Sequence, residues 1–80
     1  MDLPRYAIVG LRPVALIPTD QGGMDCVAFD WSTGELVRDL DMLDRVVLPT
    51  GDVDIVSKAQ FDAAIARLRH ERGFDDAPRS

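Results

Sequence analysis

Aspartates are the residues of this sequence whose type and spacing come closest to a chemical site. Seven of them lie in the middle of the chain: Asp25, Asp30, Asp39, Asp41, Asp44, Asp52 and Asp54. Paired carboxylates can bind Mg²⁺ or Ca²⁺, or can divide acid and base roles when their surroundings differ. The segment 52–56, DVDIV, lacks the regular oxygen ligands and the closing Glu of a calcium loop. The spacing therefore favours a polar surface, or a surface that meets a basic partner, over a metal site.

The other reactive residue types are scarce. His70 is the only histidine and Cys26 the only cysteine, which excludes a multi-histidine metal site, an intrachain disulfide and a cysteine metal cluster within one chain. His70 stands among arginines, where positive charge complements the end of a helix, and a free cysteine is typically a small buried hydrophobe. The sequence predicts no cofactor, no bound metal and no catalytic residue, which favours a binding protein over an enzyme.

A glycine pair in PTDQGG, 18–23, invites comparison with phosphate-binding loops. Such loops need a following Lys-Ser or Lys-Thr on a helix, or a G-x-G-x-x-G that opens one. Here the chain continues as MDCVAFDW, which is typical of a strand. The segment is therefore interpreted as a hairpin loop.

The charge balance points toward a protein partner. The formal net charge is −5, and basic residues cluster only near the end of the chain, whereas a nucleic-acid binder needs a positive stripe to replace counterions on phosphates. We expect no nucleic acid as a partner. The preference for Asp over Glu and Arg over Lys suggests a GC-rich bacterial genome.

The length of 80 residues predicts one domain, expected over 1–74, followed by a disordered tail over 75–80. The opening segment MDLPRYAIVG contains an acid and a proline and has no apolar run long enough for a signal sequence or a membrane span. We therefore expect a cytoplasmic protein that does not enter a membrane.

Four β strands are expected in the first half of the chain. The run 6–17, YAIVGLRPVALI, should bend at Gly10 or Pro13 into strands near 5–10 and 13–18, joined by a kink or a tight turn. The stretch DWSTGELV, 30–37, should join two more strands through a turn that ends at a left-handed Gly34, with Asp30 accepting hydrogen bonds from the turn amides.

The second half should hold short elements and one long helix. The segment 39–45 fits a turn of helix or a loop, while 45–49 and 52–56 are predicted as short strands that pair as a hairpin. A capping box formed by Ser57 and Gln60 and an apolar face over 61–68 predict a helix from about 58 to 72, capped by Gly73 and Phe74.

These elements predict an α+β fold: a four- or five-stranded antiparallel meander sheet with one C-terminal helix packed on it. A small SH3-like barrel with a terminal helix is the alternative. Both sides of the strand over 24–31 are apolar, so both faces of the sheet need a cover. We expect the helix on the Phe29 and Trp31 side, and a second subunit of a homodimer, or a barrel interior, on the Cys26 and Ala28 side.

Two functional hypotheses follow. The first is a small acidic, non-catalytic module that binds a basic protein partner by charge complementarity; in size and charge it is similar to immunity proteins, antitoxins and phage-encoded inhibitors, although no motif carries that likeness. The second is a small metal-dependent enzyme or ligand binder that uses clustered aspartates, for which specific metal binding would raise the melting temperature. The candidate partner-binding residues are Asp25, Asp30, Trp31, Asp39, Asp41 and Asp44.

Overall fold

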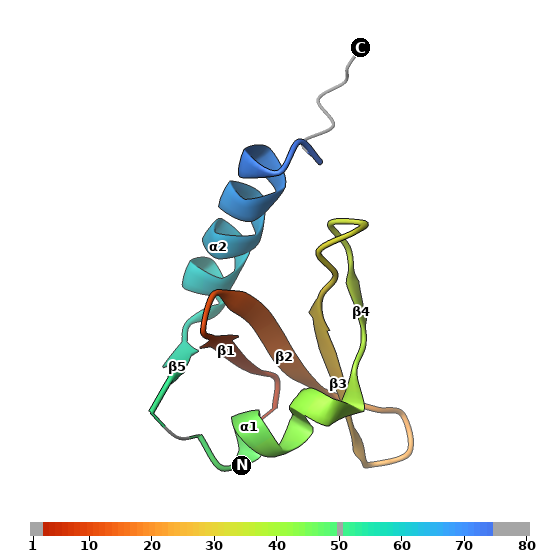
Figure 1. Ribbon diagram of the computed structural model, residues 1–80. Coiled ribbons are helices and arrows are strands. Elements are labelled where there is room, and N and C mark those ends of the chain that lie inside the picture. Colours follow the sequence, from red (N-terminus) through yellow and green to blue (C-terminus); the bar gives the residue numbers. More distant parts are fainter. Residues whose placement is uncertain (1–2, 50, 75–80) are drawn as a thin grey trace.

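The protein forms a five-stranded sheet with helical segments on both of its faces (Figure 1). The computed structural model describes residues 3–49 and 51–74. The elements in chain order are β1 (Arg5–Val9), β2 (Arg12–Pro18), β3 (Met24–Phe29), β4 (Leu36–Arg38), the 3-10 helix η1 (Leu40–Met42), α1 (Leu43–Val47), β5 (Val53–Val56) and α2 (Lys58–Glu71). The predicted tail over 75–80 lies outside the described residues.

The sheet is antiparallel throughout, in the order β4-β3-β2-β1-β5. Strands β1 to β4 follow one another as a meander, and β5 returns to pair with β1. Gly10 lies in the turn between β1 and β2 with a φ of +63°, a conformation that favours glycine. The α+β prediction with an antiparallel sheet and a C-terminal helix is confirmed. Strands β4 and β5 are the two edges of the sheet and do not pair with each other. The sheet is therefore open, and the alternative prediction of a closed SH3-like barrel is wrong.

The predicted strand over 45–49 is wrong. Residues 43–47 form α1, and β5 pairs with β1 instead of forming a hairpin with this segment. Val46 is fully buried, while Met42, Leu43 and Val47 pack around the same core. This spacing of three to four residues places all four side chains on one side of a helix, and that burial outweighs the strand preference of two adjacent valines.

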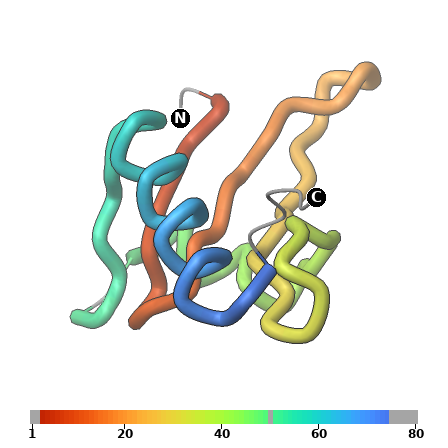
Figure 2. The backbone as a smooth tube through the Cα atoms, turned by 90° about the horizontal axis from the view of Figure 1, so that it is seen from above, coloured from red at the N-terminus to blue at the C-terminus, as the bar shows by residue number. Residues whose placement is uncertain are grey.

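The face of the sheet that carries Cys26 and Ala28 is covered by this same segment. Val46 packs there in the main core cluster with Val14 and Leu16. The expectation that a second subunit or a barrel interior covers this face is therefore corrected: η1 and α1 cover it, on the side opposite α2 (Figure 2).

The other face carries Tyr6, Ala15 and Phe29 and is covered by α2. The rings of Tyr6 and Phe61 lie 4.9 Å apart, and Phe61 and Leu68 are the buried residues of the helix. This confirms the assignment of the helix to the Phe29 side. No helix among the described residues is long and apolar enough to cross a membrane.

The ends of α2 follow the sequence prediction closely. Ser57 Oγ accepts a hydrogen bond from the Gln60 N–H, and the Gln60 side chain accepts one from the Ser57 N–H, which completes the capping box. At the other end Gly73 has a φ of +81°, and the Phe74 N–H donates to the Arg69 carbonyl at 2.7 Å. This pattern satisfies the last carbonyl groups of the helix.

Candidate binding surface

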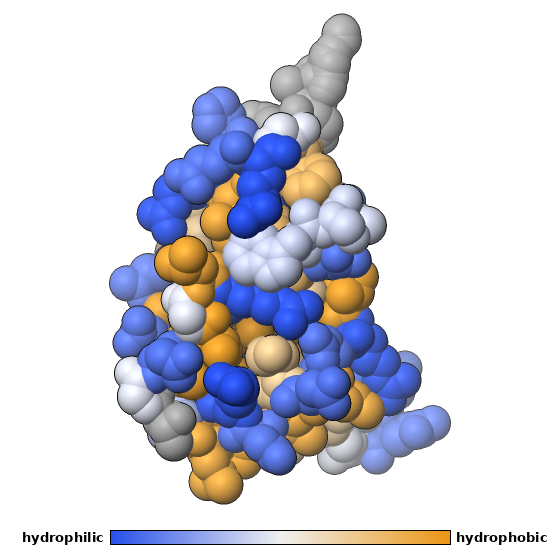
Figure 3. Space-filling view, in the orientation of Figure 1, coloured by the Kyte–Doolittle hydropathy of each residue, from blue (hydrophilic) through white to orange (hydrophobic). Residues whose placement is uncertain are grey.

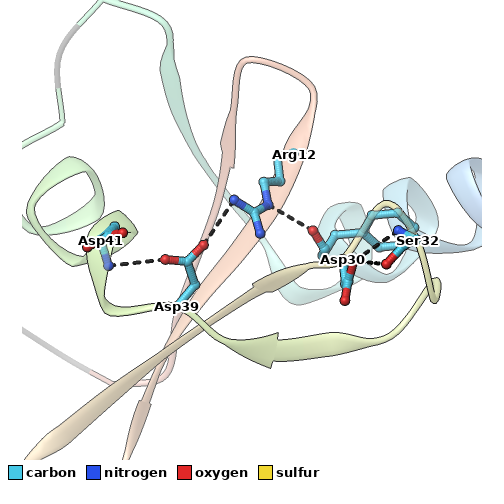
Figure 4. Close-up of polar contacts among 6 residues, drawn as sticks. Arg12, Asp30, Ser32, Asp39 and Asp41 are labelled. Carbon is cyan, nitrogen blue, oxygen red and sulfur yellow. Dashed lines mark hydrogen bonds and ion pairs between the residues drawn. The ribbon is translucent and has the colours of Figure 1, made fainter.

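Arg12 organises the polar residues between β2, β3 and η1 (Figure 4). Its Nε donates to the Phe29 carbonyl at 2.8 Å, and its Nη1 lies 3.1 Å from Asp39 Oδ2. Each of the two charged side chains is only 22% exposed, so the pair is screened less by water than a surface ion pair. Arg12 thus links the end of β3 to the start of η1.

Asp39 has a second structural role. Its Oδ1 accepts a hydrogen bond from the Asp41 N–H at 3.1 Å and caps η1, while its own N–H donates to the Cys26 carbonyl. Asp39 therefore makes three interactions within the fold, two through its carboxylate and one through its backbone N–H.

Asp25 is held between β3 and β4. Its Oδ1 lies 3.0 Å from Arg38 Nε and accepts a hydrogen bond from the Cys26 N–H at 2.9 Å. Cys26 is fully buried. Burial first, and then the nearby charges of Asp39 and Asp25, raise the pKa of the Cys26 thiol to about 11 against an opposing effect of the Arg12 charge. The thiol is neutral near pH 7, which suits a packing residue better than a nucleophile.

Asp30 and Trp31 lie at the tip of the β3–β4 hairpin. Asp30 Oδ1 accepts hydrogen bonds from the Ser32 N–H at 2.9 Å and from Ser32 Oγ at 2.8 Å, and these bonds lower the pKa of Asp30. Gly34 has a φ of +74°. The predicted turn and the predicted role of Asp30 in it are confirmed.

Trp31 is partly buried against its neighbours. Its ring meets Phe29 edge to face at a centroid distance of 5.2 Å, and the Arg72 guanidinium lies 4.4 Å from its centroid. The indole thus connects the hairpin to the C-terminal end of α2, which makes it less available as an anchor for a partner.

Asp41 and Asp44 differ from the other candidates. Both are exposed, and within residues 3–49 and 51–74 neither carboxylate takes part in an ion pair. On the same short segment the side chains of Leu40 and Leu48 are 50% and 73% exposed. Figure 3 shows hydrophilic and hydrophobic side chains interspersed over the lower part of the molecule, where α1 lies. We call Leu40, Asp41, Asp44 and Leu48 the α1 surface.

The structure thus brings the predicted residues together only in part. Asp39, Asp41 and Asp44 lie on one continuous segment, whereas Asp30 and Trp31 lie at the hairpin tip. Sequence reasoning missed Arg12 and the two exposed leucines of the α1 surface. The signal for Arg12 was available, because a single charge inside the apolar run over 6–17 needs a partner once that run is buried.

Among the described residues, no three His, Cys, Asp or Glu side chains come close enough together to hold a metal ion. Comparison with family models, curated proteins and solved structures finds no significant match to the chain.

Proposed function

We propose that the protein is a non-catalytic binding module whose α1 surface meets a basic protein partner. The observation that carries this proposal is the pair of exposed carboxylates, Asp41 and Asp44, which form no ion pair within the described chain and stand beside the exposed Leu40 and Leu48. Binding sites commonly combine an apolar centre with charges at the rim that steer association. The matching partner surface has lysine or arginine side chains around an apolar pocket.

The contacts that hold the α1 surface in place favour this role. Val46 anchors α1 in the core, and the Arg12–Asp39 pair fixes η1 to the sheet. A surface held in one conformation loses little entropy when it binds. The fold therefore presents Asp41 and Asp44 as a preorganised acidic surface.

Asp25, Asp30 and Asp39 are better explained by the fold than by a partner. Each of them accepts hydrogen bonds from the protein's own backbone. The proposed partner-binding set is therefore narrower than the one expected from the sequence, and it is centred on Asp41 and Asp44.

The experiment that tests this function compares what two variants retain from a lysate of the source organism. The first carries Asp41→Asn and Asp44→Asn, and the matched control carries Asp20→Asn and Glu35→Gln at two other exposed positions. A protein that the wild type and the control retain, and that the first variant loses, is the predicted partner. Equal retention by both variants would contradict the role of the α1 surface.

We further propose a cytoplasmic setting and a homodimer. A lone, buried cysteine is typical of proteins that work where thiols stay reduced. The reason for a dimer is no longer an uncovered face of the sheet, because α1 and α2 cover both faces. The support comes instead from two exposed hydrophobic side chains on and beside β5, Ile55 and Leu11.

A further inference from the structure

Strand β5 has one free side. It is hydrogen-bonded to β1 alone, and Figures 1 and 2 both place it at the outer side of the molecule. The Gly10 N–H donates to the Asp52 carbonyl at 2.9 Å, so the backbone of Asp52 faces β1. Because the direction alternates along an antiparallel strand, Val53 and Ile55 turn their N–H and C=O groups outward. These groups are available to another strand.

Exposed hydrophobic side chains accompany this edge. Ile55 is 45% exposed on β5 itself, while Leu11 is 76% exposed. Leu11 directly follows Gly10, whose N–H donates to the Asp52 carbonyl just before β5. Removing such side chains from water stabilises an interface in proportion to the apolar area buried.

The charges along β5 discriminate between the ways in which two copies could pair. A two-fold axis at Asp54 places its carboxylate opposite that of Asp54 of the partner subunit. An axis at Val53 places Asp54 opposite Asp52 of the partner subunit. Like charges directly opposite each other destabilise a strand pair, so both registers are unfavourable.

An axis at Ile55 avoids both conflicts. It sets Ile55 opposite Ile55 of the partner subunit and Asp54 opposite Val56 of the partner subunit. In this register Asp52 lies beyond the end of the partner's β5, and its carboxylate keeps its own pair with Arg45 at 4.0 Å. The central pair exchanges two backbone hydrogen bonds between the outward-facing groups of Ile55.

We infer that two copies of the chain pair antiparallel along β5 about a two-fold axis at Ile55, which joins their sheets into one. This interface rests on the homodimer proposed above and names the surface that forms it. It is isologous, as closed two-fold dimers require.

A proline scan of the two sheet edges tests the interface. Ile55→Pro removes the outward N–H at the axis and leaves the bonds to β1 in place, because proline is tolerated where a strand N–H faces outward. Leu36→Pro is the matched control on the opposite edge. There the carbonyl of Glu35 and the N–H of Asp39 face β3, so the N–H of Leu36 also points outward.

The readout is molar mass by light scattering after size exclusion over tens to hundreds of micromolar protein. We expect dimers for the wild type and Leu36→Pro, and a dissociation constant at least about tenfold weaker for Ile55→Pro. If Ile55→Pro fails to fold by circular dichroism, Ile55→Lys, which places like charges at the axis, is judged in the same way. A folded Ile55 variant that dimerises like the wild type overturns the β5 interface and leaves the homodimer standing. A wild type that is monomeric throughout overturns both.

Discussion

Phe74 packs directly over Gly34 at the tip of the β3–β4 hairpin. A Cβ atom at Gly34 would lie 2.7 Å from Phe74 Cγ, closer than side chains tolerate. Beside this contact, the Arg72 guanidinium stacks on the Trp31 ring. The C-terminal end of α2 is therefore fastened to the hairpin at two points, and the stretch over 30–37 is a structural turn that also anchors the helix.

Gly34→Ala should destabilise the protein more than Gly22→Ala. Both glycines have positive φ, +74° at Gly34 and +83° at Gly22, but a Cβ at Gly22 has nothing within 4 Å. The backbone strain is therefore shared, and the difference measures the contact with Phe74. We expect Gly34→Ala to lose about 1–3 kcal/mol more of the free energy of unfolding, in the range of overpacked sites. Urea denaturation of both variants measures the free energy of unfolding. Equal losses in the two variants would contradict a stabilising contact between Gly34 and Phe74.

Arg12→Met should cost more stability than Arg38→Met. The first change leaves Asp39 without its partner and the Phe29 carbonyl without a side-chain donor, in a partly buried setting. We expect a loss of about 1–3 kcal/mol. Arg38 is 69% exposed in its pair with Asp25, and such pairs contribute about 0–1 kcal/mol. Thermal and chemical denaturation of the two variants, which make the same chemical change, tests whether Arg12 organises this region.

The buried thiol should make stability fall at alkaline pH. The pKa of Cys26 is raised from 9.0 to about 11 in the folded protein. Its contribution is therefore fully present below pH 9 and is lost as the pH rises from 9 toward 11, because only the unfolded chain then releases the proton. Comparing unfolding of the wild type and Cys26→Ala from pH 7 to 10.5 isolates this effect from other groups. A difference between the two that stays constant with pH would contradict the buried, neutral thiol.

The parts of the fold that the sequence predicted well are those that local chemistry determines. The turn around Asp30 and Gly34 and the capping box of Ser57 and Gln60 each involve residues within four positions of one another. Their side chains satisfy nearby backbone groups whatever the rest of the chain does. The strands predicted near 5–10 and 13–18 are found as β1 and β2, because Gly10 marks the bend between them.

The parts that the sequence did not predict depend on distant residues. Val46 and Val47 favour a strand locally. They are helical because a helix buries their side chains against the apolar Cys26 face of the sheet. Asp39 was expected to meet a partner, yet it pairs with Arg12, 27 positions away in the chain. No local pattern distinguishes it from Asp41 or Asp44, so the candidate surface could be located only approximately.

The most direct test of the acidic α1 surface is the association rate of the captured partner with the wild type and with the Asp41→Asn, Asp44→Asn variant, measured at several salt concentrations. If these carboxylates steer association, the wild-type rate falls as salt increases, and the variant associates more slowly with a weaker salt dependence. The Asp20→Asn, Glu35→Gln control, with the same net charge, should follow the wild type more closely. Identical rates for the wild type and the Asp41, Asp44 variant at every salt concentration would contradict the proposed function.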